Sequence, residues 1–210
     1  MQISKHIKSI KRTPTLYELY LEDQNRTLHD RISSLEHQLR RSQTELLTDS
    51  LTNVGNRRRF DESFKYELMH LVRSRGKEYL SIVLIDLDNF KQINDLQGHN
   101  SGDKILIKAG NILKSTFSRD IDTVCRYGGD EFTIILPKTD NNGARIVVDM
   151  ARRNAEKSDI SMSFGISSTN SLEIPKPKHD LDEIIRCMVA EADARMYEDK
   201  LSKKGSLLRN

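Results

Sequence analysis

Two adjacent glycines, Gly128 and Gly129, separate two apolar segments and constrain the fold of this chain most strongly. Val124 and Cys125 lead into the pair, and residues 132–136 form an apolar run after it. Glycine adopts the positive φ angles of tight hairpin turns at little steric cost, so this pattern predicts a β-hairpin. We therefore expect part of the central sheet to be antiparallel.

Acidic residues gather beside the predicted hairpin and at the end of a second strand. Asp130 and Glu131 follow the glycines directly, and Asp86 and Asp88 follow the buried strand predicted for 80–85. If the two strands are neighbours, Asp86, Asp130 and Glu131 meet at one edge of the sheet. Clustered carboxylates repel one another unless a cation neutralises them, and their oxygens suit Mg²⁺ or Mn²⁺. The pattern indicates a two-metal site for phosphoryl transfer, although for Asp86 alone a turn cap is the simpler interpretation.

The remaining segments predict a mixture of helices and strands. Apolar spacing and turn residues mark the boundaries of these elements. Helices are expected at 57–75, 101–117, 142–157 and 181–203, and a further strand at 160–167. Together with the hairpin they indicate an α/β chain of the α+β type, in which helices flank the sheet.

Composition argues against several classes of protein. No apolar run approaches the ~18 residues of a membrane-spanning helix, so no stable membrane insertion is expected. A net charge of +3, dispersed along the chain, gives no footprint for nucleic acid. The two cysteines, Cys125 and Cys187, indicate no disulfide framework and favour a reducing, cytoplasmic location.

The first 48 residues differ from the rest of the chain. Residues 1–12 are basic and predict a loosely packed tail, with a short helix on a membrane surface as the alternative. Residues 13–48 contain no glycine, and a frame with alternating steps of three and four runs along them. Its apolar members are Leu21, Leu28, Ile32, Leu35, Leu39 and Leu46, and Asn25 and Ser42 complete it. This spacing predicts a coiled-coil dimerisation helix, or otherwise a single amphipathic helix packed on the domain formed by 49–210.

Five motifs occur in a fixed order between residues 49 and 200. The first two are Asp49-Ser50-Leu51-Thr52 with Asn56-Arg57-Arg58, and the acidic strand end at Asp86. The third combines Phe90-Lys91, Asn94-Asp95, Gly98-His99 and Gly102-Asp103. The fourth is Gly128-Gly129-Asp130-Glu131-Phe132, and the fifth combines Ala192-Asp193, Met196-Tyr197 and Lys200. In this order they resemble the GGDEF family of diguanylate cyclases.

The resemblance implies a palm-like nucleotidyl-cyclase fold and a reaction. Two GTP molecules would condense to cyclic di-GMP and two pyrophosphates, each 3′-hydroxyl attacking the α-phosphate of the other nucleotide. The two half-sites must face each other, so a homodimer is implied. By resemblance, Asp86, Glu131 and the main-chain carbonyl of Leu87 hold Mg²⁺ or Mn²⁺, with two ions per half-site. Asp130 would bind a metal ion or activate the 3′-hydroxyl.

The same resemblance assigns Asn94 and Asp103 to recognition of guanine. An ionised aspartate accepts hydrogen bonds from the N1–H and N2–H pair of guanine, which adenine lacks. Asp103 therefore favours GTP over the alternative of a cyclase that uses ATP or mixed nucleotides. Gly128 and Gly129 would let the substrate approach the hairpin.

The phosphates of GTP would meet main-chain amides and lysines. The resemblance points to the amides of Phe90 and Lys91 and to the side chain of Lys200. Lys204 matches a further basic phosphate contact by spacing only, because the glycine that normally accompanies it is displaced in this chain.

Arg119 and Asp122 form an R-x-x-D pattern with five residues between it and Gly128. At this offset the resemblance implies a site where cyclic di-GMP inhibits its own synthesis, with a surface salt bridge as the plain alternative. An inactive GGDEF domain that senses cyclic di-GMP there is the alternative function, although such receptors commonly lose the acids that this chain keeps. Control of the cyclase is expected from the register of the coiled coil, a protein partner on the N-terminal helix, expression level or product inhibition.

Overall fold

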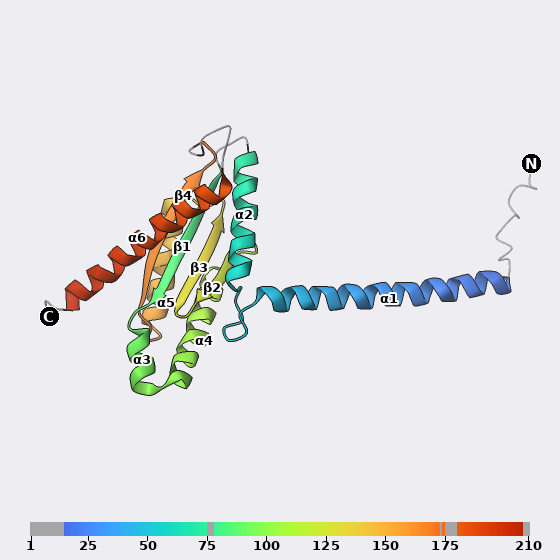
Figure 1. Ribbon diagram of the computed structural model, residues 1–210, viewed down its shortest axis with the longest axis horizontal. Helices are drawn as coiled ribbons and strands as arrows, with labels where there is room; N and C mark the ends of the chain where they lie inside the picture. The colour runs from blue at the N-terminus through green and yellow to red at the C-terminus, as the bar shows by residue number, and fades with distance from the viewer. Residues whose placement is uncertain (1–14, 75–77, 173, 175–179, 208–210) are drawn as a thin grey trace, which may run out of the picture. The chain divides into compact units, whose positions relative to one another are not determined.

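The computed structural model describes residues 15–74, 78–172, 174 and 180–207 (Figure 1). The predicted basic tail, residues 1–12, lies outside this range, and so do the side chains of Leu39 and Lys204. The chain divides into two units, Met1–Leu46 and Leu47–Asn210. Within the described range, no helix combines the length and the apolar character needed to cross a membrane.

The first unit is built on helix α1, Leu16–Leu47. Thr15 and Glu18 form a capping box at its start. The Glu18 carboxylate accepts from the Thr15 amide at 2.6 Å, and the Thr15 hydroxyl accepts from the Glu18 amide at 3.2 Å. The predicted stripe is exposed on this helix, with Leu28 at 58% and Leu35 at 49%. An exposed apolar stripe on a long polar helix favours pairing with another helix.

The second unit contains a four-stranded sheet in the order β2-β3-β1-β4. The strands are β1 (Tyr79–Leu87), β2 (Thr123–Gly128), β3 (Glu131–Pro137) and β4 (Met162–Asn170). Every neighbouring pair is antiparallel, and β2 and β3 form the predicted hairpin around the glycine pair. The α+β fold with an antiparallel sheet and flanking helices is therefore confirmed.

Helices cover both faces of this sheet (Figure 1). They are α2 (Arg57–Arg73), α4 (His99–Thr116), α5 (Asn141–Glu156) and α6 (Leu181–Leu207), whereas α3 (Phe90–Gln97) packs on α4. The sequence did not predict α3, because this helix has only eight residues and none of them is fully buried, although Phe90 packs against the core.

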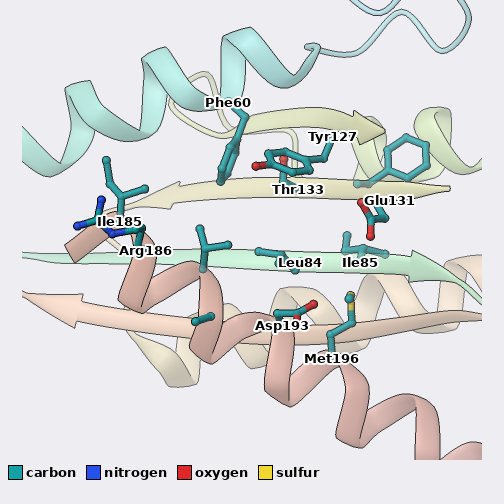
Figure 2. A pocket seen from close by; sticks show the side chains of 13 residues that line it. Phe60, Leu84, Ile85, Tyr127, Glu131, Thr133, Ile185, Arg186, Asp193 and Met196 are labelled. Atoms are coloured by element: carbon teal, nitrogen blue, oxygen red, sulfur yellow. The ribbon is translucent and has the colours of Figure 1, made fainter. Parts of the chain in front are cut away.

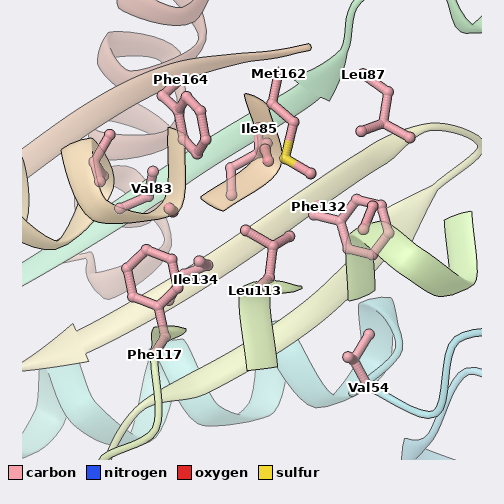
Figure 3. Packing of buried hydrophobic residues seen from close by; sticks show 14 of the residues in the cluster. Val54, Val83, Ile85, Leu87, Leu113, Phe117, Phe132, Ile134, Met162 and Phe164 are labelled. Atoms are coloured by element: carbon pink, nitrogen blue, oxygen red, sulfur yellow. The ribbon is translucent and has the colours of Figure 1, made fainter. Parts of the chain in front are cut away.

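Alternation along the strands creates two cores. On one face, Val83, Ile85 and Ile134 pack with α4 and α5, as Figure 3 shows around Leu113 and Phe164. On the other face, Leu80, Ile82, Cys125 and Ile135 pack against α2 and α6. Successive strand residues point to opposite faces, so Asp86, two residues beyond Leu84, belongs to the face of α2 and α6.

Gly165 of β4 lets α6 pack closely on the sheet. A Cβ atom at this position would lie 1.9 Å from the Ala192 carbonyl oxygen and 2.4 Å from the Met196 nitrogen. Both atoms belong to the backbone of α6, so no rotamer change could relieve such a contact. The same helix carries Lys200 and Lys203, and the glycine therefore helps to set how near these lysines come to the acidic edge.

Candidate active site

The β1–β3 register brings the predicted acids together. Asp86 lies directly opposite Glu131 in this antiparallel pair, and the Leu87 amide donates to the Asp130 carbonyl oxygen at 3.3 Å. Ile82 and Ile135, further along the same two strands, belong to the core under α2 and α6. Asp86 and Glu131 therefore point to this face of the sheet.

A cavity of about 380 Å³ lies beside these acids on the same face. Figure 2 shows Glu131 and Asp193 near one end, with Phe60 and Tyr127 along the wall. The Arg57 guanidinium sits 4.5 Å from the centroid of the Tyr127 ring. The mostly apolar wall reduces screening by water near Glu131, which strengthens the electrostatic interactions of this carboxylate.

Unbalanced negative charge characterises the site. The pKa of Glu131 is raised by partial burial first and then by the charges of Asp130, Asp86 and Asp193. Burial and the charge of Asp86 likewise raise the pKa of Asp130. Raised carboxyl pKa values mean that these groups resist being ionised together, so the site favours an added cation.

Lys200 supplies the cation closest to Asp86 among the described residues. Its Nζ lies 2.5 Å from Asp86 Oδ1. Burial alone would lower the pKa of Lys200, but the hydrogen bond to Asp86 and the charges of Asp86, Asp88 and Asp130 outweigh burial and raise it. The lysine predicted to contact phosphate thus reaches from α6 to the acidic edge.

The donor set fits a hard divalent cation. Asp86, Glu131 and the Leu87 carbonyl offer oxygen atoms at one strand end, and the carboxylates are short of positive charge. In the part of the chain that is described, no group of three or more His, Cys, Asp or Glu side chains forms a ready-made metal cage. The set is therefore two carboxylates and a carbonyl, a combination in which Mg²⁺ keeps part of its water shell.

The predicted phosphate contacts lie at the start of α3. Asn89 precedes this helix in the left-handed conformation, at φ 61° and ψ 19°, and provides no side-chain cap. The first amides of an α-helix have no partner within the helix. The amides of Phe90 and Lys91 are among these groups, so the turn after β1 offers them to an anion.

The predicted guanine readers lie on α3 and α4, which pack together. Asn94 Oδ1 is buried and has no hydrogen-bond partner among the described residues. A Cβ atom at Gly102 would lie 2.0 Å from that oxygen, so the glycine makes room for the Asn94 amide. Because Asp103 is the next residue after Gly102, the fold brings the two predicted readers near each other. The orphaned acceptor is suited to an N–H donor from a ligand.

Arg119 and Asp122 contact each other in this structure. The Arg119 Nη2 atom lies 2.6 Å from Asp122 Oδ1, and it also donates to the Thr139 hydroxyl at 2.8 Å. This is the salt bridge that the sequence allowed as the alternative. The Arg119 side chain remains 48% exposed, so its outer edge is open to solvent.

Sequence reasoning assigned no role to Lys203, which the structure brings to the same strand end. Its Nζ lies 3.0 Å from Asp88 Oδ2, while Lys204 contributes no described side chain. The available signal was spacing, because residues three apart share a face of a helix and Lys203 follows Lys200 by three.

Comparison with known proteins identifies the family. The family model described as "Diguanylate cyclase, GGDEF domain" matches residues 46–206. The chain belongs to the GGDEF family. The resemblance inferred from the five motifs is thereby confirmed.

Relatives agree with this assignment. Diguanylate cyclase A of Treponema denticola is 35% identical over 164 residues, covering 73% of this chain and 41% of the relative. The chain thus spans less than half the length of this curated GGDEF protein.

Two solved structures share the fold. The coiled coil and GGDEF domain of DgcB from Caulobacter crescentus, in complex with c-di-GMP, matches with a TM-score of 0.71 at 21% identity. The match covers 87% of this chain and 95% of that one. Diguanylate cyclase SiaD from Pseudomonas aeruginosa, in complex with its activator SiaC, matches with a TM-score of 0.62 at 26% identity. This match covers 89% of this chain and 73% of that one.

Proposed function

We propose that this chain is a diguanylate cyclase that condenses two GTP molecules into cyclic di-GMP and two pyrophosphates. The observation that carries the proposal is the pairing of Asp86 with Glu131, with Asp130 next to the pair and Lys200 within reach. The name of the Treponema denticola relative supports the same activity.

In the proposed reaction, the 3′-oxygen of each GTP forms a bond to the α-phosphorus of the other nucleotide. The bond from that phosphorus to the bridging oxygen of the β-phosphate breaks, and pyrophosphate leaves. Asp130 takes the proton of the 3′-hydroxyl, a role that suits a carboxylate whose pKa is raised. Asp86, Glu131 and the Leu87 carbonyl would hold divalent ions, Mg²⁺ or Mn²⁺, with two ions per half-site. These ions would stabilise charge on the phosphates.

The chain's other residues bind and orient the nucleotide. Phe90 and Lys91 present amides to the phosphates, and Lys200 neutralises the terminal one, with Lys204 as a further candidate. The open Gly128–Gly129 turn admits the substrate, since nothing lies within 4 Å of a Cβ atom placed at either glycine.

Guanine selection rests on Asn94 and Asp103. Asn94 Oδ1, which has no hydrogen-bond partner among the described residues, would accept a hydrogen bond from an N–H of the base. The exposed Asp103 carboxylate would accept hydrogen bonds from the N1–H and N2–H pair. Adenine has no matching pair of donors, which disfavours ATP as the substrate.

Each protomer supplies one half-site, so the proposed enzyme acts as a homodimer, paired at least partly through α1. The activator in the SiaD structure suggests that a protein partner docking on α1 could regulate this pairing. The two free cysteines keep the cytoplasm as the proposed location.

Cyclic di-GMP is also the proposed inhibitor, bound at Arg119 and Asp122. The exposed guanidinium edge suits a phosphate or a guanine edge, provided that the ligand competes with the present ion pair.

Incubation with GTP and Mg²⁺, followed by nucleotide chromatography, tests the function. We expect cyclic di-GMP from the natural chain and none from Glu131→Gln. A folded dimer that binds cyclic di-GMP but makes none would instead be a receptor.

A further inference from the structure

Lys203 connects the end of α6 to the strand ends beside the acids. Its Nζ lies 3.0 Å from Asp88 Oδ2 and 3.4 Å from Ser163 Oγ, and it also donates to the Met162 carbonyl. Asp199, four residues earlier on α6, lies 3.6 Å from the same nitrogen. The side chain of Lys203 is only 28% exposed and that of Asp88 only 10%, so solvent screens this ion pair weakly.

Asp88 is held by several donors at once. The hydroxyls of Ser161 and Ser163 each donate to one of its carboxylate oxygens at 2.6 Å, and its own amide donates to the Ser161 carbonyl at 3.0 Å. The serines carry no charge, so Lys203 supplies the positive charge in this group of contacts. Loss of that charge would leave a mostly buried carboxylate without its hydrogen-bonded cation, and only the weaker, more distant charge of Lys200 would remain among the described lysines that act on it.

The turn that follows Asp88 has a left-handed backbone conformation. Asn89 lies at φ 61°, a region in which asparagine is enriched among non-glycine residues, and it starts α3 without a side-chain cap. With no cap from Asn89, the contacts of its neighbours hold the start of α3 in place. Asp88 is the anchor on one side of this turn, and the amides of Phe90 and Lys91 lie on the other.

We propose that Lys203 is a positioning residue that locks the Asp88–Asn89 turn, so that the first amides of α3 stay directed at the phosphates of the nucleotide. The assignment of these amides rests on the proposed function. Lys203 acts through Asp88 and the turn, whereas Lys200, one turn earlier on α6, reaches Asp86 itself. The two lysines therefore differ in role, although they share a helix face.

Removal of the charge from Lys203 tests this role. Lys203→Met keeps most of the aliphatic stem, and Lys203→Arg keeps the cation. Arg195→Met is the matched control, because Arg195 also ties α6 to β4, through the Ile166 carbonyl at 2.5 Å, and has no contact with the acids of the site.

Two measurements that need no turnover give the decisive readouts. The first is the Kd of 3′-deoxyGTP with Mg²⁺, a nucleotide that cannot condense, measured by calorimetry. The second is hydrogen exchange, in the ligand-free protein, of the Asp88 and Ile93 amides, which flank the turn and donate to the Ser161 and Asn89 carbonyls. For Lys203→Met we expect a Kd about tenfold higher and faster exchange, with kcat at saturating GTP within about threefold of the natural chain. Lys203→Arg should recover most of the affinity, and Arg195→Met should change Kd less than twofold.

An unchanged Kd and unchanged exchange in Lys203→Met would overturn the inference, as would equal weakening by Arg195→Met. A natural chain that shows the expected exchange pattern but makes no cyclic di-GMP would overturn the proposed function instead, and leave the locking of the turn supported.

Discussion

Substitution of Gly165 by alanine should both destabilise the fold and impair the site. The added Cβ atom would start 1.9 Å from the Ala192 carbonyl oxygen, whereas side-chain carbons essentially never approach closer than 3.0 Å. The backbone of α6 must therefore move by about 1 Å or more. Overpacking costs about 1–3 kcal/mol, and the upper value applies because the opposing atoms are backbone. For a chain of this size, about 3 kcal/mol lowers Tm by roughly 6–12 °C.

The same displacement acts on Lys200. Its Nζ lies 2.5 Å from Asp86 Oδ1, and a shift of α6 away from β4 by about 1 Å moves the base of this side chain relative to the acids. A misplacement of that size costs about 100-fold in catalysis, so kcat/KM of the folded fraction should fall by about this factor. Calorimetry gives Tm, and the cyclase assay below Tm gives kcat/KM.

Gly143→Ala is the matched control for this prediction. Its added Cβ would meet only side-chain atoms, at 3.1 Å from Thr139 and 3.2 Å from Asp140, so a change within about 1 kcal/mol is expected. If Gly165→Ala kept Tm within 2 °C and kcat/KM within threefold, the idea that this glycine sets the position of α6 would be refuted.

Four further predictions concern charge, base recognition, inhibition and assembly. Glu131→Gln should raise Tm by about 1–2 °C at pH 7.5 without metal, since partial burial of the carboxylate and repulsion by its acidic neighbours together cost about 0.5 kcal/mol at this partly exposed site. Because the pKa of Glu131 is raised in the folded state, its carboxyl costs stability only where it is ionised. The gain in Tm from Glu131→Gln should therefore vanish near pH 4. An equal gain at pH 4 and pH 7.5 would contradict this cause. Gly102→Ala should displace Asn94 and raise KM for GTP about tenfold. ITP lacks the 2-amino group, so its KM should change little. An equal rise in KM for both nucleotides would contradict this role of Asn94. Arg119→Ala should abolish inhibition by added cyclic di-GMP with initial rates unchanged, whereas undiminished inhibition would place the inhibitor elsewhere. Deletion of 1–47 should make activity fall steeply on dilution, and an identical concentration dependence would reject dimerisation through α1.

The sequence predicted the features that depend on local chemistry. Gly128 and Gly129 indicated the hairpin because glycine suits the turn, and the apolar run before Asp86 indicated a buried strand. The structure adds that β3 pairs with β1 directly, which brings Asp86 opposite Glu131. Local patterns cannot establish this pairing, because strand neighbours depend on the whole topology.

Features that depend on contacts between distant segments were missed. Helix α3 has only eight residues, too few to show a repeated apolar period, although Phe90 packs against the core. Lys203 and Asp88 are far apart in the chain. Lysine and aspartate are mostly exposed in proteins, so the sequence alone does not show that these two form a mostly buried ion pair. In the sequence, Gly165 looks like an ordinary strand residue, because its close contact with the backbone of α6 depends on how the two segments pack.

In the proposed reaction, one dimer of half-sites joins two GTP molecules. The most direct measurement is quantitative chromatography of a reaction with GTP and Mg²⁺, counting nucleotide and pyrophosphate together. We expect one cyclic di-GMP and two pyrophosphates for every two GTP consumed, with Asp130→Asn inactive under the same conditions. A folded, dimeric protein that binds GTP and Mg²⁺ yet releases no pyrophosphate and no cyclic dinucleotide would contradict it.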